Sequence, residues 1–143
     1  MSIGSRGGRS SRWVLLADVY EQAGQLEEAW SALQQGEREI ADNNERYFAA
    51  EWWRVKGKLY LRQADEAQAE VCWQQAIAIA RSQKARLFEL KATTDLGCLW
   101  QRQGRVAEAR QRLAEICGWF GNEEGVDVEQ ARGLLYHMGE QLP

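Results

Sequence analysis

The feature that most constrains this sequence is a set of aromatic, small and large apolar residues that returns every 40 positions. Three sets are spaced in this way: Tyr20, Tyr60 and Trp100; Ala29, Ala69 and Ala109; Leu33, Trp73 and Leu113. A fixed period of this length is typical of a supersecondary unit that cannot bury its apolar face alone, so that successive copies stack. We therefore expect a fold built from three stacked copies.

Each copy carries the pattern of two packed helices. A large-small-aromatic helix with Ala17, Gly57 or Gly97 at the small position precedes a turn and a second helix that carries the repeated alanine. Small residues let two helices approach within van der Waals contact, and the aromatic residue fills the angle between them. The sequence predicts helices near 11–23, 26–42, 45–63, 66–82, 85–103 and 106–119, which divide the repeats at about 11–44, 45–84 and 85–120.

The two ends of the chain differ from the repeats. After Phe120 a turn-rich break leads to Asp127, an expected N-cap, and to an apolar stripe that contains Ala131, Leu134 and Leu135. This pattern predicts a capping helix at about 127–140. Residues 1–10 are rich in Gly, Ser and Arg, and we expect a disordered lead-in there, followed by one domain at 11–143.

These motifs resemble the tetratricopeptide repeat (TPR) family. Residues 13–136 are similar to the C-terminal TPR region of large bacterial signal-transduction ATPases and class III nucleotidyl cyclases. The similar stretches are residues 15–25, 54–60, 74–81, 99–105 and 118–120. The resemblance implies an all-α, TPR-like α-solenoid of three antiparallel helix pairs plus a C-terminal capping helix, and a scaffold, sensor or regulatory role in signal transduction.

The departures from the family limit what the resemblance implies. The repeat is longer than the usual TPR unit of about 34 residues. Lys56 stands where Leu16 and Leu96 fill an apolar slot, so we expect looser packing in the second pair. No Gly-rich loop ending in Gly-Lys-Ser/Thr occurs. The ATPase and cyclase activities of such proteins are therefore not expected here.

A stripe of cations indicates a candidate binding surface. Arg54, Lys58 and Arg62 are spaced i, i+4 and i+8, which places them on one face of a helix. In TPR-like stacks the first helices of the pairs line a concave groove, and Lys91 and Arg102 would extend the stripe there. Asp18 and Glu21 would make the first pair acidic. We expect a groove with a basic middle for an acidic or C-terminal peptide, with a merely solvated face as the alternative.

Two adjacent tryptophans have different expected roles. Trp53 occupies a structural slot of the repeat, whereas Trp52 has no such role and is expected either between neighbouring pairs or in the groove. If Trp52 joins Tyr47 in an aromatic pocket, the domain would be a small-ligand sensor, which is the alternative to a protein-interaction module. At the amino end, Val14 and Leu15 carry more apolar surface than one helix face needs, and we expect a homodimer through them, with coverage by a preceding repeat of a longer protein as the alternative.

Other functional classes find little support. The single histidine, His137, and the cysteines Cys72, Cys98 and Cys117 lack metal-ligand spacing and an orienting third group, so neither an enzyme, a metal site nor a cofactor is expected. A net charge of −3 argues against nucleic acid. Short apolar runs argue against a membrane partner, and the odd cysteine count favours the cytoplasm.

Overall fold

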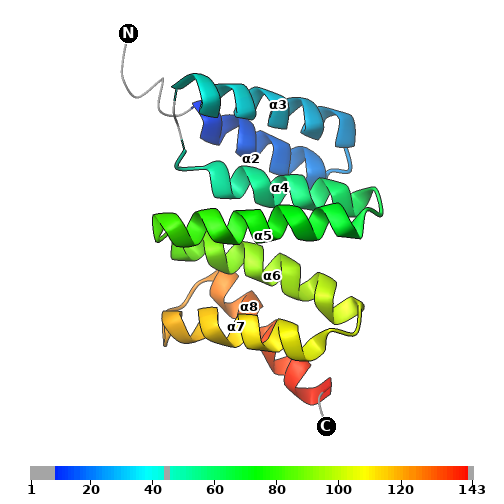
Figure 1. The fold of residues 1–143 in the computed structure, drawn as a ribbon, viewed down its shortest axis with the longest axis vertical. Helices are drawn as coiled ribbons and strands as arrows, with labels where there is room; N and C mark the ends of the chain where they lie inside the picture. Colours follow the sequence, from blue (N-terminus) through cyan, green and yellow to red (C-terminus); the bar gives the residue numbers. More distant parts are fainter. Residues whose placement is uncertain (1–8, 44–45, 142–143) are drawn as a thin grey trace.

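The computed structural model describes residues 9–43 and 46–141, and within them it contains seven α-helices and no strand (Figure 1). The helices are α2 (Arg9–Gln22), α3 (Leu26–Asn43), α4 (Ala49–Arg62), α5 (Glu66–Gln83), α6 (Arg86–Arg102), α7 (Val106–Phe120) and α8 (Val126–Gln141). The expected all-α fold class is therefore confirmed.

The helix bounds agree with the sequence-based ranges to within a few residues, with one clear exception at the start of α4. The helix begins at Ala49 rather than near residue 45, because residues 46–48 form a turn in which the Ala49 amide donates to the Arg46 carbonyl. Phe48 in this turn packs against Phe88, with 5.6 Å between ring centroids. Arg9 and Ser10, expected in the lead-in, belong to α2, and residues 1–8 lie outside the described residues.

Successive helices pack side by side down the long axis of the molecule, from α2 and α3 at one end to α7 and α8 at the other (Figure 1). Each helix contacts the next along the chain, most extensively α2 with α3 and α4 with α5. The even-numbered helices α2, α4, α6 and α8 also contact one another in series. Side chains on these four helices are therefore brought together across the repeat.

The turns that join α2 to α3, α4 to α5 and α6 to α7 share one backbone geometry. In each turn an amide donates to a carbonyl five residues earlier, the pattern of a Schellman cap: Gln25 to Tyr20 at 2.9 Å, Asp65 to Tyr60 at 2.9 Å and Arg105 to Trp100 at 2.8 Å. The preceding residue has a positive φ in each case: 77° at Gly24, 63° at Ala64 and 82° at Gly104. The period of the sequence is thus also a period of the structure.

The small residues expected between paired helices lie at close contacts. A Cβ atom on Gly57 would be 2.5 Å from Nε1 of Trp73, and one on Gly97 would be 2.9 Å from Cδ1 of Leu113. The Trp73 indole also donates a 3.0 Å hydrogen bond to the Arg54 carbonyl, which fixes the ring over the glycine. These contacts confirm the predicted role of the two glycines.

Lys56 does not leave a gap in the second pair. Its ammonium lies 4.9 Å from the Trp52 ring centroid, 5.0 Å from that of Trp53 and 6.0 Å from that of Tyr60. Cation–π attraction lets a charged side chain occupy a slot that is apolar in the other repeats. The expectation of looser packing in the second pair compared Lys56 with leucine and did not include its contacts with the three aromatic rings.

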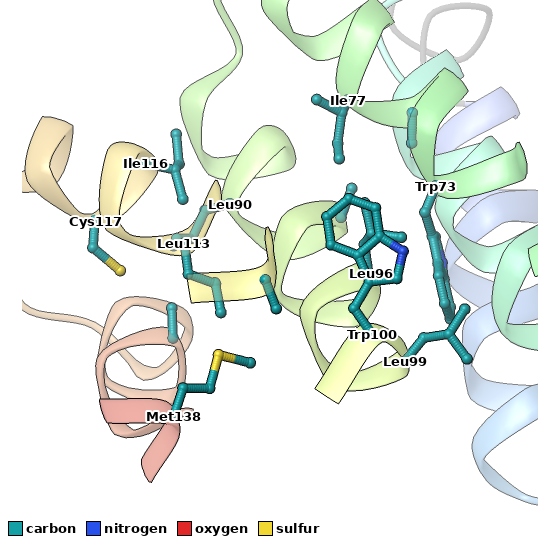
Figure 2. Close-up of a cluster of buried hydrophobic side chains, with 14 of the residues drawn as sticks. Trp73, Ile77, Leu90, Leu96, Leu99, Trp100, Leu113, Ile116, Cys117 and Met138 are labelled. Carbon is teal, nitrogen blue, oxygen red and sulfur yellow. The ribbon is translucent and has the colours of Figure 1, made fainter. Parts of the chain in front are cut away.

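Two clusters of buried apolar side chains form the core, one on each half of the stack. Figure 2 shows part of the larger one, in which Trp73, Leu96, Leu113 and Met138 come from four different helices. Met138 and Ala131 are fully buried, so α8 packs on α6 and α7. Among the described residues, none of the helices combines the length and the apolar character that crossing a bilayer requires.

Candidate ligand cleft on the even-numbered helices

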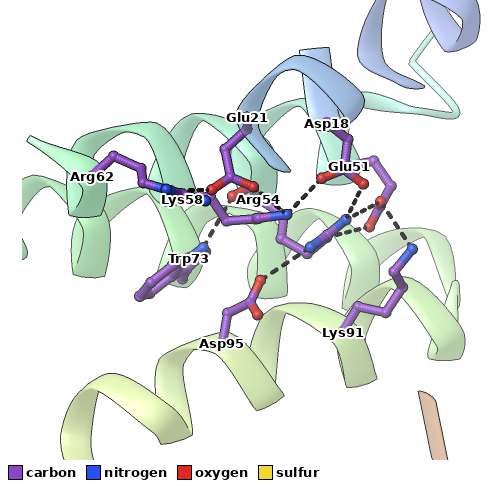
Figure 3. A network of polar contacts seen from close by, with 9 residues as sticks. All are labelled: Asp18, Glu21, Glu51, Arg54, Lys58, Arg62, Trp73, Lys91 and Asp95. Carbon is purple, nitrogen blue, oxygen red and sulfur yellow. Dashed lines mark hydrogen bonds and ion pairs between the residues drawn. The ribbon is translucent and has the colours of Figure 1, made fainter. Parts of the chain in front are cut away.

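The predicted stripe Arg54, Lys58 and Arg62 does lie along one face of α4, and this face meets α2 on one side and α6 on the other (Figure 3). The helical spacing of four residues puts the three cations in line. All three make ion pairs with carboxylates of the same chain. The stripe is therefore part of the internal structure as well as of the surface.

Arg54 is the centre of these contacts and is buried. Its guanidinium donates to both carboxylate oxygens of Glu51 at 3.0 and 2.9 Å and to Asp95 on α6 at 3.1 Å, and it lies 3.5 Å from Asp18 on α2. Burial alone would lower the pKa of Arg54, but the hydrogen bonds and charges of these carboxylates outweigh it and raise the pKa. One side chain thus connects three helices.

Lys58 and Arg62 connect α4 to α2 alone. The Lys58 ammonium lies 2.6 Å from Asp18 and 2.8 Å from Glu21, and Arg62 lies 2.7 Å from Glu21. Burial opposes ionisation of both carboxylates, yet the hydrogen bonds and positive charges of the cations lower the pKa of Asp18 and of Glu21. Burial alone would lower the pKa of Lys58, but its hydrogen bonds to Asp18 and Glu21 raise it.

With Lys91, which lies 3.3 Å from Glu51, these contacts form what we call the ion-pair network. Its members are Asp18, Glu21, Glu51, Asp95, Arg54, Lys58, Arg62 and Lys91. Four carboxylates face four cations, so the formal charges cancel. The expected basic middle of the groove is thereby corrected, because neighbouring helices supply the neutralising carboxylates.

Beside the network lies a cleft of about 360 Å³ between α4 and α6. It is lined by Glu21, Lys58, Leu61, Arg62, Trp73, Asp95, Cys98 and Arg102. Leu61 and Trp73 give it an apolar part. The most exposed cations on its border are Arg62 and Arg102, whose side chains retain 46% and 59% of their accessible surface. Arg102 makes a long contact of 3.7 Å with Glu66.

The other residues expected in the groove lie elsewhere. Trp52 is 6% exposed, belongs to the core and donates a 2.7 Å hydrogen bond to the Leu33 carbonyl, so of its two expected places it takes the one between neighbouring pairs and not the one in the groove. The expected aromatic pocket of Trp52 and Tyr47 is corrected as well, since Tyr47 packs against Phe48 and Phe88. Lys91 borders a separate depression of about 50 Å³ near Asp127 of α8.

The two residues expected at the amino-terminal interface, Val14 and Leu15, differ in their exposure to solvent. Val14 is 2% exposed and belongs to the core, which corrects its assignment to a surface contact. Leu15 is 60% exposed, and so is Val19, one helical turn further on. An apolar surface is thus present on α2, formed by a different pair of residues.

No arrangement for covalent chemistry is evident among the described residues of the cleft. Cys98 is exposed there, and partial burial of its sulfur raises the pKa of the thiol. Cys117 is buried on α7, whereas His137 is exposed on α8. The described part of the chain holds no group of three or more His, Cys, Asp or Glu residues placed to hold a metal ion.

Comparison with known proteins gives no match: no protein-family model, no curated protein and no solved structure is similar to this chain at a significant level. The geometry of the cleft and of the ion-pair network therefore carries the functional argument.

Proposed function

We propose that this protein is a TPR-like stack of three antiparallel helix pairs capped by α8, and that it works as a cytoplasmic protein-interaction module. Its ligand is an acidic peptide segment bound in the cleft between α4 and α6. The observation that carries this proposal is the combination of an apolar wall, Leu61 and Trp73, with two exposed guanidinium groups, Arg62 and Arg102, in one cleft. The TPR resemblance adds a scaffold or regulatory role in signal transduction.

The chemistry of the lining favours a segment that presents an apolar side chain beside a carboxylate. Leu61 is only partly buried and gains from covering its apolar surface, while the core residue Trp73 borders the cleft with little exposed area of its own, and a volume of about 360 Å³ accommodates a few side chains. Guanidinium groups bind carboxylates in a planar, bidentate geometry that an ammonium group does not offer. Arg62 and Arg102 are therefore the recognition residues that we propose.

Arg54 and Lys58 have a different role in this proposal. Both are held by two or more carboxylates of α2, α4 or α6, and Arg54 is 6% exposed. A ligand carboxylate would have to displace these partners at close range, which costs the buried ion pairs. Arg54 and Lys58 instead hold the even-numbered helices at the spacing that leaves the cleft open.

A peptide array tests the proposal with a defined probe. We would use fluorescent eight-residue peptides that combine Asp or Glu with Leu or Phe, and measure binding by anisotropy for the wild type and for Arg62→Gln with Arg102→Gln. We expect the double variant to lose at least about tenfold in affinity, because each charge-assisted hydrogen bond contributes about 1.5–3 kcal/mol. The matched control removes two exposed charges elsewhere, Arg38→Gln with Lys84→Gln, and should bind as the wild type does.

Two results would contradict the proposal. One is that the cleft variant and the control bind the best peptide equally well, which would move the site away from the cleft. The other is that no acidic peptide of the array binds at ~100 μM, a concentration that occupies a site of micromolar affinity. A small acidic metabolite that quenches tryptophan fluorescence through Trp73 would then support the alternative, a small-ligand-sensing domain, because Trp73 lines the cleft.

A further inference from the structure

A second depression, of about 250 Å³, lies between α5 and α7, with Trp100 of α6 at its floor. Trp100 belongs to the core cluster of Figure 2 and is 3% exposed. The α7 side of the depression is a single helix face, because its four residues there are spaced i, i+3, i+4 and i+7. Apart from Trp100 the lining is polar, and it shares no residue with the α4–α6 cleft: Arg81, Trp100, Glu108, Gln111, Arg112 and Glu115.

Arg112 is the residue at which the third pair departs from the other two. One and two repeat periods earlier the same position holds Cys72 and Ala32, which are small and are 1% and 2% exposed. The Arg112 guanidinium lies over Trp100, with Cζ 5.7 Å from the ring centroid, and its Nη2 donates to Oε1 of Gln74 on α5 at 3.3 Å. The packing pattern of the repeat therefore does not explain a long charged side chain at this position.

Three polar groups of this depression have no partner within the described part of the chain. Two of them are buried donors, Nε1 of Trp100 and Nη1 of Arg112. The third is the carboxylate of Glu115. Arg112 and Glu115 have the i, i+3 spacing at which Arg105 pairs with Glu108, but the Arg112 guanidinium lies over Trp100 instead. A buried donor without an acceptor costs free energy, which an oxygen atom of a ligand would recover.

We propose that this depression binds a free amino acid in its zwitterionic form. The α-carboxylate of the ligand accepts hydrogen bonds from Nη1 of Arg112 and Nε1 of Trp100, and its α-ammonium group donates to Glu115. In the free protein Arg105 and Arg112 cover the indole, at 4.4 and 5.7 Å from the ring centroid. The Arg112 guanidinium therefore turns off the ring as the carboxylate enters, a side-chain rotation of a kind that is common on binding.

The balance of charge in the depression favours a dipolar ligand over a simple ion. Two guanidinium groups and two carboxylates line it, so their formal charges cancel. Arg81 and Glu108 are each paired with a neighbouring side chain, which leaves Arg112 and Glu115 for the ligand. A simple anion would meet Glu115 and a simple cation would meet Arg112, whereas a zwitterion pairs with both. A volume of about 250 Å³ fits a small metabolite, and the amide of Gln111 favours one with a polar side chain.

The indole N–H signals in a nitrogen-15 NMR spectrum test the proposed hydrogen bond directly. The chain has seven tryptophans, and the signals of Trp100 and Trp30 are assigned by their loss in Trp100→Phe and Trp30→Phe. We would titrate the labelled protein with each of the common amino acids up to ~10 mM, which occupies most of a site of millimolar affinity. We expect at least one polar amino acid to move the Trp100 signal downfield, because its N–H gains an acceptor. Trp30 also has a buried N–H without a partner but does not line the depression, so its signal should stay in place.

Matched ligands and variants separate a zwitterion site from other kinds of site. The N-acetyl derivative of the best amino acid lacks the ammonium group and its methyl ester lacks the carboxylate, and each should bind at least about tenfold more weakly. Glu115→Gln and Arg112→Gln should lose affinity for the amino acid by the same factor, whereas Glu123→Gln, at an exposed position of the α7–α8 turn, should bind as the wild type does. Circular dichroism checks that each variant folds.

Three results would overturn the proposal. The first is a Trp100 signal that no amino acid moves at ~10 mM, a concentration at which a millimolar site is mostly occupied. The second is an N-acetyl derivative that binds as tightly as the amino acid, which would indicate a simple carboxylate ligand. The third is a Glu115→Gln variant with unchanged affinity, which would place the ammonium group elsewhere. None of these results bears on the peptide cleft, whose test relies on Arg62 and Arg102.

Discussion

Two kinds of helix contact hold this protein together, and they depend on different properties of the sequence. Within a pair, as between α4 and α5, the contact is apolar and steric: Trp73 lies against Gly57, where a methyl group would clash. Between pairs, on the even-numbered helices, the contact between α2, α4 and α6 is made by the ion-pair network. The contact within a pair depends on a small residue at one position. The contact between pairs depends on opposite charges on neighbouring helices.

The difference matters for energetics. An apolar contact stabilises in proportion to the area that it buries. Removing charges from water costs free energy, and the attraction between them offsets this cost only when every charge keeps its partners. We therefore expect the network to respond more strongly to the loss of one member than the apolar contacts do to a small change in size.

The largest effect is expected for Arg54→Met. Methionine preserves much of the side-chain volume but leaves Asp95 without its guanidinium partner and Glu51 with Lys91 alone. Breaking a buried pair in this way destabilises by about 3 kcal/mol. Urea unfolding followed by circular dichroism measures the change. Arg38→Met, which removes an exposed guanidinium from α3, is the control and should differ from the wild type by less than about 0.5 kcal/mol. Equal stabilities of the two variants would show that the network does not stabilise the fold.

A smaller effect is expected for Gly57→Ala, which tests the steric contact. Alanine is the better helix former, yet its Cβ would lie 2.5 Å from Nε1 of Trp73, so the indole must move and strain its hydrogen bond to Arg54. We expect a loss of about 2 kcal/mol in the same urea measurement. Gly118→Ala is the matched control, because no atom lies within 4 Å of its Cβ position in α7, and it should stabilise by about 0.5–1 kcal/mol. A stabilised Gly57→Ala variant would mean that the paired helices are further apart than described.

These two contacts also explain what the sequence can predict. The steric pattern repeats residue size at one period, so three copies locate the helices and their small contact positions without a structure. The start of α4 cannot be found in this way, because the turn at 46–48 depends on Phe48 packing against Phe88, which lies on α6 in the next pair. The sequence leaves two places open for Trp52 for a related reason: the partner that decides between them, the Leu33 carbonyl, belongs to another pair.

The ion-pair network leaves a signal in the sequence that no single helix contains. Lys58 and Asp18 are separated by exactly one repeat period, and so are Lys91 and Glu51. Arg62 and Glu21, like Asp95 and Arg54, are separated by one position more than the period. In a stacked repeat such spacings put opposite charges side by side on neighbouring copies. Charge pairs at the repeat period therefore predict a neutral surface in place of a basic groove.

Acid should weaken the network by a moderate amount. The pKa values of Asp18 and Glu21 lie below their ordinary values of 3.8 and 4.5, so the folded state holds these carboxylates ionised more strongly than the unfolded chain does. Their stabilisation is complete above the ordinary values and is lost as the pH falls through the lowered ones. We expect Asp18→Asn to flatten the decline of stability in acid, below the ordinary value of 3.8, where the wild type loses the contribution of this carboxylate. Urea titrations at several pH values measure it, and identical pH profiles of variant and wild type would contradict the assignment.

The smallest effect concerns the turn inside the second pair, where an alanine takes the backbone conformation that a glycine takes in the other two turns. Ala64 has a φ of 63° at the position where the first and third turns have Gly24 and Gly104. A side chain at such a φ costs roughly 1 kcal/mol relative to glycine, and the larger entropy of an unfolded glycine offsets part of the gain from removing it. We therefore expect Ala64→Gly to stabilise the protein by about 0.5 kcal/mol, and Gly104→Ala to destabilise it by about the same amount. Paired urea melts can resolve this difference in sign even though each change is small. If Ala64→Gly destabilises instead, the second turn does not share the geometry of the other two, and the contact of Gly57 with Trp73 would have to set the angle of its pair alone.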